Sequence, residues 1–137
     1  MILYLDSSSL IKLYVTEEGS DEVRRLVEES SLLAASVVAY PEARSALARL
    51  RREGHLANSG YEVAKTELEQ DWASYLALEV TESVWRLAGD LTEKHGLRGL
   101  DSIHLATFLL LDAGNQEKVQ FSSYDGRLRA AARAEVS

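Results

Sequence analysis

The sequence predicts an α/β fold in which a mostly parallel sheet is covered by helices. Short apolar runs, each too short for a helix, alternate along the chain with longer amphipathic stretches. Such alternation is typical of parallel sheets with helical crossovers. The chain has 137 residues, the usual size of one domain, and its 46% hydrophobic content is enough for a substantial core. We therefore expect residues 1–137 to form a single domain.

The first predicted strand covers residues 2–5, which are apolar throughout, as in a buried parallel sheet. A short helix over residues 8–15 follows. Ser20 is a plausible N-cap for the next helix, because acidic residues stand in its first turn, where the helix dipole favours anions. Residues 32–35 form the second predicted strand.

An amphipathic helix is predicted over about residues 37–52, where apolar residues fall on one face at helical spacing. Pro41 suits a first helical turn and disrupts an interior one, so the helix either starts near Pro41 or kinks there. Gly54 ends this helix, and a further helix runs from its cap at Asn58 through Trp72.

The second half continues with a strand at residues 75–80 and a helix from the cap Thr81 to about His95, closed by Gly96. Residues 100–112 are almost all apolar and predict a buried helix. The chain then gives a short strand at residues 119–122, a turn at Asp125-Gly126 and a last helix to about Arg133.

Composition narrows the possible functions. The chain has no cysteine, which excludes a disulfide scaffold and a thiolate metal site. Its net charge of −7 argues against a nucleic-acid binder, which usually has a basic surface. However, a metal-binding carboxylate cluster would itself raise the acidic count, and the arginines gather within residues 44–52 and 127–133. The charge balance therefore does not exclude nucleic acid.

The ends and apolar runs of the chain predict no membrane segment. The N-terminus has no basic region and its apolar run is too short for a signal peptide. The longest apolar stretch, residues 105–111, is far shorter than the roughly 20 residues that a membrane span needs. We expect a cytoplasmic protein without a membrane partner.

Four acidic residues have ordinary structural explanations when each is taken alone. Asp6 and Asp101 can cap helices, and Glu42 suits the first turn of a helix. Asp125-Gly126 is a common turn dipeptide.

Their joint placement favours a site. Ligands bind beyond the carboxyl ends of the strands in open α/β sheets, and both Asp6 and Asp125 directly follow predicted strands. Asp101 follows a loop that can bring it to the same edge, and Glu42 lies just off the apolar stripe of its helix, where it can point into a cleft.

Carboxylates in one cleft repel each other. A pair roughly 4 Å apart costs about 4 kcal/mol at an effective dielectric constant of about 20, so a cation must lie among them or some must be protonated. Ligand sets made only of carboxylate oxygens suit Mg²⁺ or Mn²⁺.

Four segments carry a resemblance to a known family: ILYLDSS at residues 2–8, SVVAYPE at 36–42, LRGLDSIHLA at 97–106 and FSSYD at 121–125. In order and spacing they resemble the PIN domain family, and within it the toxin ribonucleases of VapBC-type toxin–antitoxin pairs. The third segment is the most specific. The resemblance implies one PIN domain over residues 1–137, a three-layer α/β/α fold with a central, mostly parallel sheet of four to five strands.

The resemblance also implies an active site. It assigns the family's metal-binding and catalytic acids to Asp6, Glu42, Asp101 and Asp125, with Ser7 and Ser123 in support. It further implies Mg²⁺- or Mn²⁺-dependent hydrolysis of RNA that leaves a 5′-phosphate, a homodimer, and inhibition by a cognate antitoxin. Two departures are Ser123, where many members have Thr, and Pro41 before the second acid.

Other functions stay open at this point. A phosphatase with an aspartyl nucleophile usually has a second acid two residues later, where this chain has Ser8, and a receiver domain expects an acidic pair near its N-terminus. A degenerate PIN domain that only binds RNA is a third alternative, which the complete set of four acids disfavours.

Two further residues deserve a hypothesis. His104 lies three residues after Asp101 and could bind a metal, but a histidine inside an apolar helix is more often a packed, hydrogen-bonded residue. We assign no histidine to catalysis. Arg49 falls near the side of its helix that carries Glu42 and is a candidate contact to an RNA phosphate.

Overall fold

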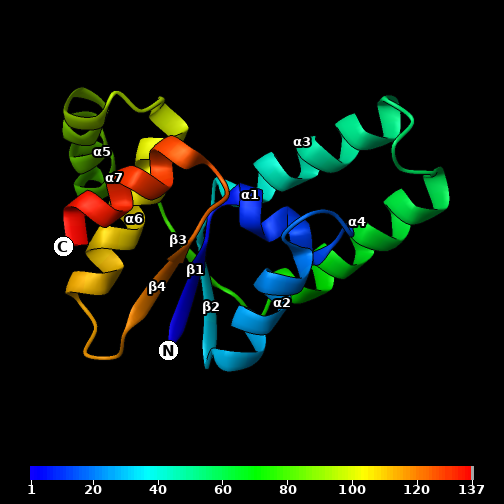
Figure 1. Ribbon diagram of the computed structural model, residues 1–137, viewed down its shortest axis with the longest axis horizontal. Helices are drawn as coiled ribbons and strands as arrows, with labels where there is room; N and C mark the ends of the chain where they lie inside the picture. Colours follow the sequence, from blue (N-terminus) through cyan, green and yellow to red (C-terminus); the bar gives the residue numbers. More distant parts are fainter. Residues whose placement is uncertain (137) are drawn as a thin grey trace.

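The computed structural model describes residues 1–136 and arranges them as a parallel sheet between two layers of helices (Figure 1). The strands are β1 (Ile2–Leu5), β2 (Leu32–Ser36), β3 (Leu76–Leu78) and β4 (Val119–Ser122), in the order β3-β2-β1-β4. All three pairings are parallel. The predicted three-layer α/β/α fold is confirmed, with four strands in the described part of the chain.

The strand order reverses between the neighbouring strands β1 and β4. The chain moves from β1 to β2 and β3 on one side, and then returns to the other side of β1 for β4. Such a switch point opens a crevice beyond the carboxyl ends of the two strands on either side of it, where α/β proteins bind ligands. Asp6 directly follows β1, and Ser123 directly follows β4, so both residues lie at this point.

The two faces of β1 belong to two separate halves of the core. Its four residues are all buried, and because strand side chains alternate, Ile2 and Tyr4 pack on one face while Leu3 and Leu5 pack on the other. The first face is covered by α5 (Glu82–His95), α6 (Gly99–Ala113) and α7 (Gly126–Val136). The second is covered by α1 (Ser7–Leu10), the 3-10 helix η1 (Ile11–Leu13), α2 (Ser20–Glu29), α3 (Ala39–Arg52) and α4 (Asn58–Trp72).

Several predicted element ends were wrong. The N-cap of α2 is Gly19, with φ of 92°, because the Ser20 hydroxyl instead donates to the Val15 carbonyl and accepts from the Glu17 amide. Ala57, not Asn58, precedes α4, and the Asn58 side chain makes no capping bond there.

Other elements are longer, shorter or more exposed than predicted. The first helix breaks into α1 and η1, β3 is shorter than residues 75–80, and α7 extends three residues past Arg133 to Val136. Helix α3 begins at Ala39, so Pro41 lies in its first turn and causes no kink. Helix α6 is not fully buried, since Leu100 is 48% exposed. No helix in residues 1–136 is both long and apolar enough to cross a membrane.

Helix α5 has both predicted ends. Thr81 accepts a hydrogen bond from the Val84 amide at 3.4 Å, and Gly96 follows the helix with φ of 64°. This left-handed conformation suits glycine, because a Cβ atom disfavours it. The helix also contains Gly89, which has helical backbone geometry and open space around it.

These two glycines should respond in opposite directions to alanine. Gly96→Ala should lower the free energy of unfolding by about 1–2 kcal/mol, because alanine disfavours the left-handed region. Gly89→Ala should raise it by about 0.5–1 kcal/mol, because alanine is the better helix former. Urea denaturation followed by circular dichroism measures both, and a shift of the same sign in the two variants would contradict the described end of α5.

Candidate functional site

Asp6 is a buried carboxylate, only 3% exposed, and it lies between the end of β1 and the start of α1. Its Oδ1 accepts hydrogen bonds from the Ser9 amide at 3.0 Å and from the Ser8 hydroxyl at 2.7 Å. Its Oδ2 accepts from the Ser123 hydroxyl at 2.5 Å. A carboxylate offers about four acceptor positions, so these three donors stabilise the buried charge and leave room for a further ligand.

Two serine hydroxyls join the ends of β1 and β4. Ser123 accepts a hydrogen bond from the Asp125 amide at 3.1 Å while it donates to Asp6. Ser8 accepts from the Tyr124 amide at 2.9 Å while it donates to Asp6. The segment after β4 is therefore fixed to Asp6 through both hydroxyls. Asp125 also accepts from the Leu128 amide at 2.9 Å, so this acid caps α7.

Asp101 lies in the first turn of α6, which begins at Gly99, and the prediction that it caps this helix was wrong. Burial is the main cause that raises its pKa, and the negative charges of nearby Asp125 and Asp6 raise it further. Arg98, with its Nε at 3.8 Å from Asp101 Oδ2, acts in the opposite direction. The structure therefore brings three of the four predicted acids into one electrostatic neighbourhood.

Glu42 lies in the first turn of α3 and reaches α6 through a histidine. Its Oε1 is 2.7 Å from Nε2 of His104, whose Nδ1 is 2.9 Å from the Tyr4 hydroxyl. His104 is 1% exposed. The prediction of a packed, hydrogen-bonded histidine is confirmed.

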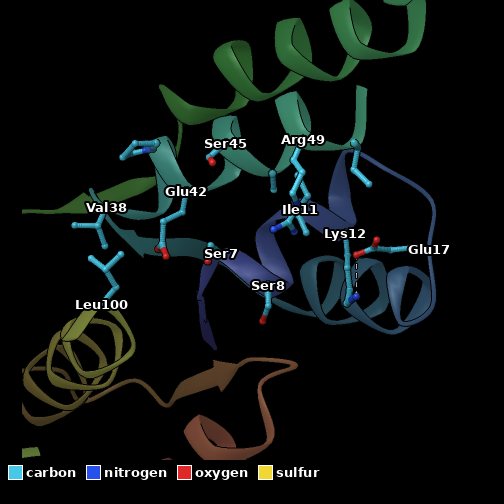
Figure 2. Close-up of a pocket in the computed structure, with 13 residues that line it drawn as sticks. Ser7, Ser8, Ile11, Lys12, Glu17, Val38, Glu42, Ser45, Arg49 and Leu100 are labelled. Carbon is cyan, nitrogen blue, oxygen red and sulfur yellow. Dashed lines mark hydrogen bonds and ion pairs between the residues drawn. The ribbon is translucent and has the colours of Figure 1, made fainter. Parts of the chain in front are cut away.

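Two hollows lie beside the acids. The larger, of about 740 Å³, is lined by Glu42, Ser7, Lys12, Arg49 and mainly apolar side chains. Figure 2 shows Glu42 and Arg49 extending from α3 toward the segment that carries Ser7 and Ile11. The smaller, of about 450 Å³, contains both acids and cations: Asp101, Asp125, Arg98 and Arg127.

The donor atoms of this region suit a hard divalent cation, because the predicted ligands offer only carboxylate oxygens. In residues 1–136, however, no three carboxylate or imidazole side chains converge closely enough to enclose an ion. Glu42 is held by His104, and one oxygen of Asp125 caps α7. The residues fit a metal in chemistry and location, and the assignment of all four acids as ligands stays a prediction.

The supporting serines were only partly predicted. Ser123 lies against Asp6 as expected. The Ser7 side chain makes no hydrogen bond within residues 1–136 and lines the larger hollow, whereas Ser8 and Ser9 supply the donors to Asp6. The run of three serines after Asp6 was the available signal, since serine hydroxyls and amides in a first helical turn commonly bond an N-cap carboxylate.

Known proteins are similar to this chain in sequence and in fold. The PIN domain family model matches residues 3–134. A protein named Ribonuclease VapC45 from Mycobacterium tuberculosis (strain CDC 1551 / Oshkosh) is 36% identical over 134 residues, which cover 97% of this chain and 90% of that protein.

Solved structures are similar over most of their length. FitAcB from Neisseria gonorrhoeae matches with a TM-score of 0.72 and 20% identity, over 97% of this chain and 94% of that chain. VapC20 from Mycobacterium tuberculosis, described as a Sarcin-Ricin loop cleaving toxin, matches with a TM-score of 0.66 and 16% identity, over 94% of each chain.

Asp101→Asn should stabilise the metal-free protein at neutral pH. The fold raises the pKa of Asp101 above its ordinary value of 3.8, so above the raised pKa the ionised carboxyl opposes folding. This penalty fades as the pH falls toward the ordinary value. In EDTA at neutral pH the variant should melt at a higher temperature than the wild type, and the gain should shrink in acid. Differential scanning calorimetry at several pH values measures this.

Asp90→Asn is the matched control, because Asp90 is an exposed carboxylate on α5 far from this cluster in sequence. It should leave the melting temperature nearly unchanged. If Asp101→Asn instead lowered the melting temperature at neutral pH, the ionised Asp101 would be a stabilising group. That result would contradict a raised pKa of Asp101 in the folded protein.

Proposed function

The chain belongs to the PIN domain family, and on this premise we propose that it is a Mg²⁺- or Mn²⁺-dependent endoribonuclease, the toxin of a toxin–antitoxin pair. The proposal treats residues 1–137 as one PIN domain. The observation that carries it is the gathering of Asp6, Asp101 and Asp125 at the switch point of the sheet, where burial and then the charges of Asp125 and Asp6 raise the pKa of Asp101. The name of VapC45 supports RNA as the substrate.

The metal would be held by Asp6, Glu42, Asp101 and Asp125. A bound Mg²⁺ or Mn²⁺ acidifies water and stabilises negative charge on a phosphoryl oxygen, which is the chemistry that phosphodiester hydrolysis needs. The repulsion around Asp101 supports a cation in this position, because a positive charge would relieve it.

The chain's own side chains prepare the site for that chemistry. Ser8 and Ser123 hold Asp6 in one orientation, so its remaining acceptor position has a fixed direction. Arg98 and the exposed Arg127 line the hollow that contains Asp101 and Asp125, where they can accept an RNA phosphate beside the acids. On the other side, Arg49 borders the larger hollow next to Glu42, together with Lys12, whose Nζ is 2.9 Å from Oε1 of Glu17. A single strand of RNA would thus meet cations on both sides of the acids.

The partners follow from the same proposal. We assign the protein to the cytoplasm, as a homodimer whose activity is restrained by a cognate antitoxin. Because the net charge is −7, we expect RNA to contact a narrow row of cationic side chains and not a broad basic surface.

RNA cleavage should require both the metal and Asp101. Wild-type protein incubated with single-stranded RNA and Mg²⁺ or Mn²⁺ should produce fragments with 5′-phosphates, and EDTA should stop the reaction. Asp101→Asn should abolish cleavage, because the variant lacks an ionised ligand while keeping the size of the side chain. Gel analysis of end-labelled RNA measures both effects.

Fragments that end in a 2′,3′-cyclic phosphate would contradict hydrolysis by water. If the protein binds RNA but does not cleave it in the presence of any divalent metal, the alternative of a catalytically silent RNA-binding module would be favoured. Incorporation of phosphate into Asp6 from acetyl phosphate would favour the aspartyl-phosphate alternative.

Arg49 should contribute to RNA binding through a phosphate. In an Asp101→Asn background, which prevents cleavage, Arg49→Ala should weaken binding of a single-stranded RNA and reduce the slope of log affinity against log salt by about 0.7. Fluorescence anisotropy at several salt concentrations measures this. Arg52→Ala is the control, because Arg52 is an exposed arginine of the same helix that does not line the hollow. If the two changes had equal effects, the proposed contact between Arg49 and an RNA phosphate would be wrong.

A further inference from the structure

The buried His104 is part of a chain of hydrogen bonds with a defined direction. At one end the Ser36 amide donates to the Tyr4 hydroxyl oxygen at 3.3 Å. Burial raises the pKa of Tyr4 far above its ordinary value, so the phenol keeps its proton. The single hydroxyl hydrogen is then available for Nδ1 of His104, 2.9 Å away.

The tautomer of His104 follows from these contacts. In the tautomer with its hydrogen on Nε2, Nδ1 of His104 accepts from the Tyr4 hydroxyl. Nε2 lies 2.7 Å from Oε1 of Glu42, and an ionised carboxylate can only accept. The hydrogen bonds therefore run in one direction, from the backbone of β2 through Tyr4 and His104 to Glu42.

This chain connects Glu42 to the elements that carry the other acids. His104 lies three residues after Asp101 on α6, so both side chains project from one face of that helix. Tyr4 lies on β1, two residues before Asp6. Glu42 comes from α3, on the other side of the sheet, and within the described residues its side chain has no hydrogen bond other than the one to His104.

We propose that His104 is a positioning residue that holds Oε1 of Glu42 through its Nε2 hydrogen and so leaves Oε2 free for the divalent cation of the proposed function, on which this inference rests. A glutamate side chain has three rotatable bonds, and the buried imidazole removes that freedom before the cation binds. Groups that orient metal ligands in this way commonly affect metal affinity by about 10–100-fold.

Two substitutions distinguish the roles of the two imidazole nitrogens. The amide nitrogen of His104→Gln can occupy the place of Nε2 and still donate to Glu42. The amide of His104→Asn is one carbon shorter, so it occupies the place of Nδ1 and faces Tyr4 only. Both changes remove the same buried ring, and so a purely structural role predicts similar effects of the two.

Mn²⁺ affinity, measured on RNA-free protein from the electron paramagnetic resonance signal of free Mn²⁺, is the readout. We expect His104→Asn to weaken Mn²⁺ binding by about 10–100-fold, and His104→Gln to bind nearly as tightly as the wild type. Tyr4→Phe should give an intermediate loss, because it removes only the donor that fixes the tautomer. Circular dichroism confirms that each variant is folded.

The possible results are distinct. Equal Mn²⁺ affinity in the wild type and both His104 variants, or an equal loss in both variants, would overturn the positioning role while leaving the metal site intact. A wild type that binds no Mn²⁺ would instead contradict the proposed metal-dependent function.

A second measurement uses the wild type alone, in case the variants do not fold. Long-range ¹H–¹⁵N correlation spectra of the imidazole report which nitrogen carries the hydrogen. A hydrogen on Nε2 of His104 supports the inference, and an Nε2 atom without a hydrogen overturns it.

Discussion

The burial of the Asp6 carboxylate determines how the ends of β1 and β4 are built. An ionised carboxylate that is removed from water costs several kcal/mol unless it is paired or hydrogen-bonded. Here the compensation comes entirely from Ser8, Ser9 and Ser123. The hydroxyls of Ser8 and Ser123 also accept hydrogen bonds from backbone amides of the segment after β4. The need to satisfy one charge thus fixes the loop that presents Asp125.

The neighbouring acids show the opposite situation. Asp101 has no comparable set of donors, and its raised pKa comes from burial and from the charges of Asp125 and Asp6, which Arg98 and His104 offset only in part. Repulsion between nearby charges is typical of functional sites, where it lowers the stability of the folded protein. The molecule therefore combines a well-satisfied acid at the end of β1 with a poorly satisfied one at the start of α6.

Sequence reasoning succeeded where local pattern and topology act together. The apolar run before Asp6 and the run before Ser123 identified two strands, and the rule for parallel sheets placed their ends at one edge. It failed for Ser20, whose hydroxyl bonds the backbone before its helix, and for Asp101, because α6 begins two residues earlier, at Gly99. It could not assign His104 to Glu42, because that contact joins residues 62 positions apart across two layers. No periodicity in either helix carries that information.

The bond between Ser123 and Asp6 spans 117 positions of sequence. Closing so long a loop costs entropy that no local contact repays, and contacts of this kind form late on a folding pathway. Asp6 is synthesised well before β4, yet it acquires its complete set of donors only after β4 has been made and has paired with β1. Translation therefore separates the appearance of Asp6 from the completion of the site, and a chain that ends before β4 lacks the arrangement that the complete fold provides.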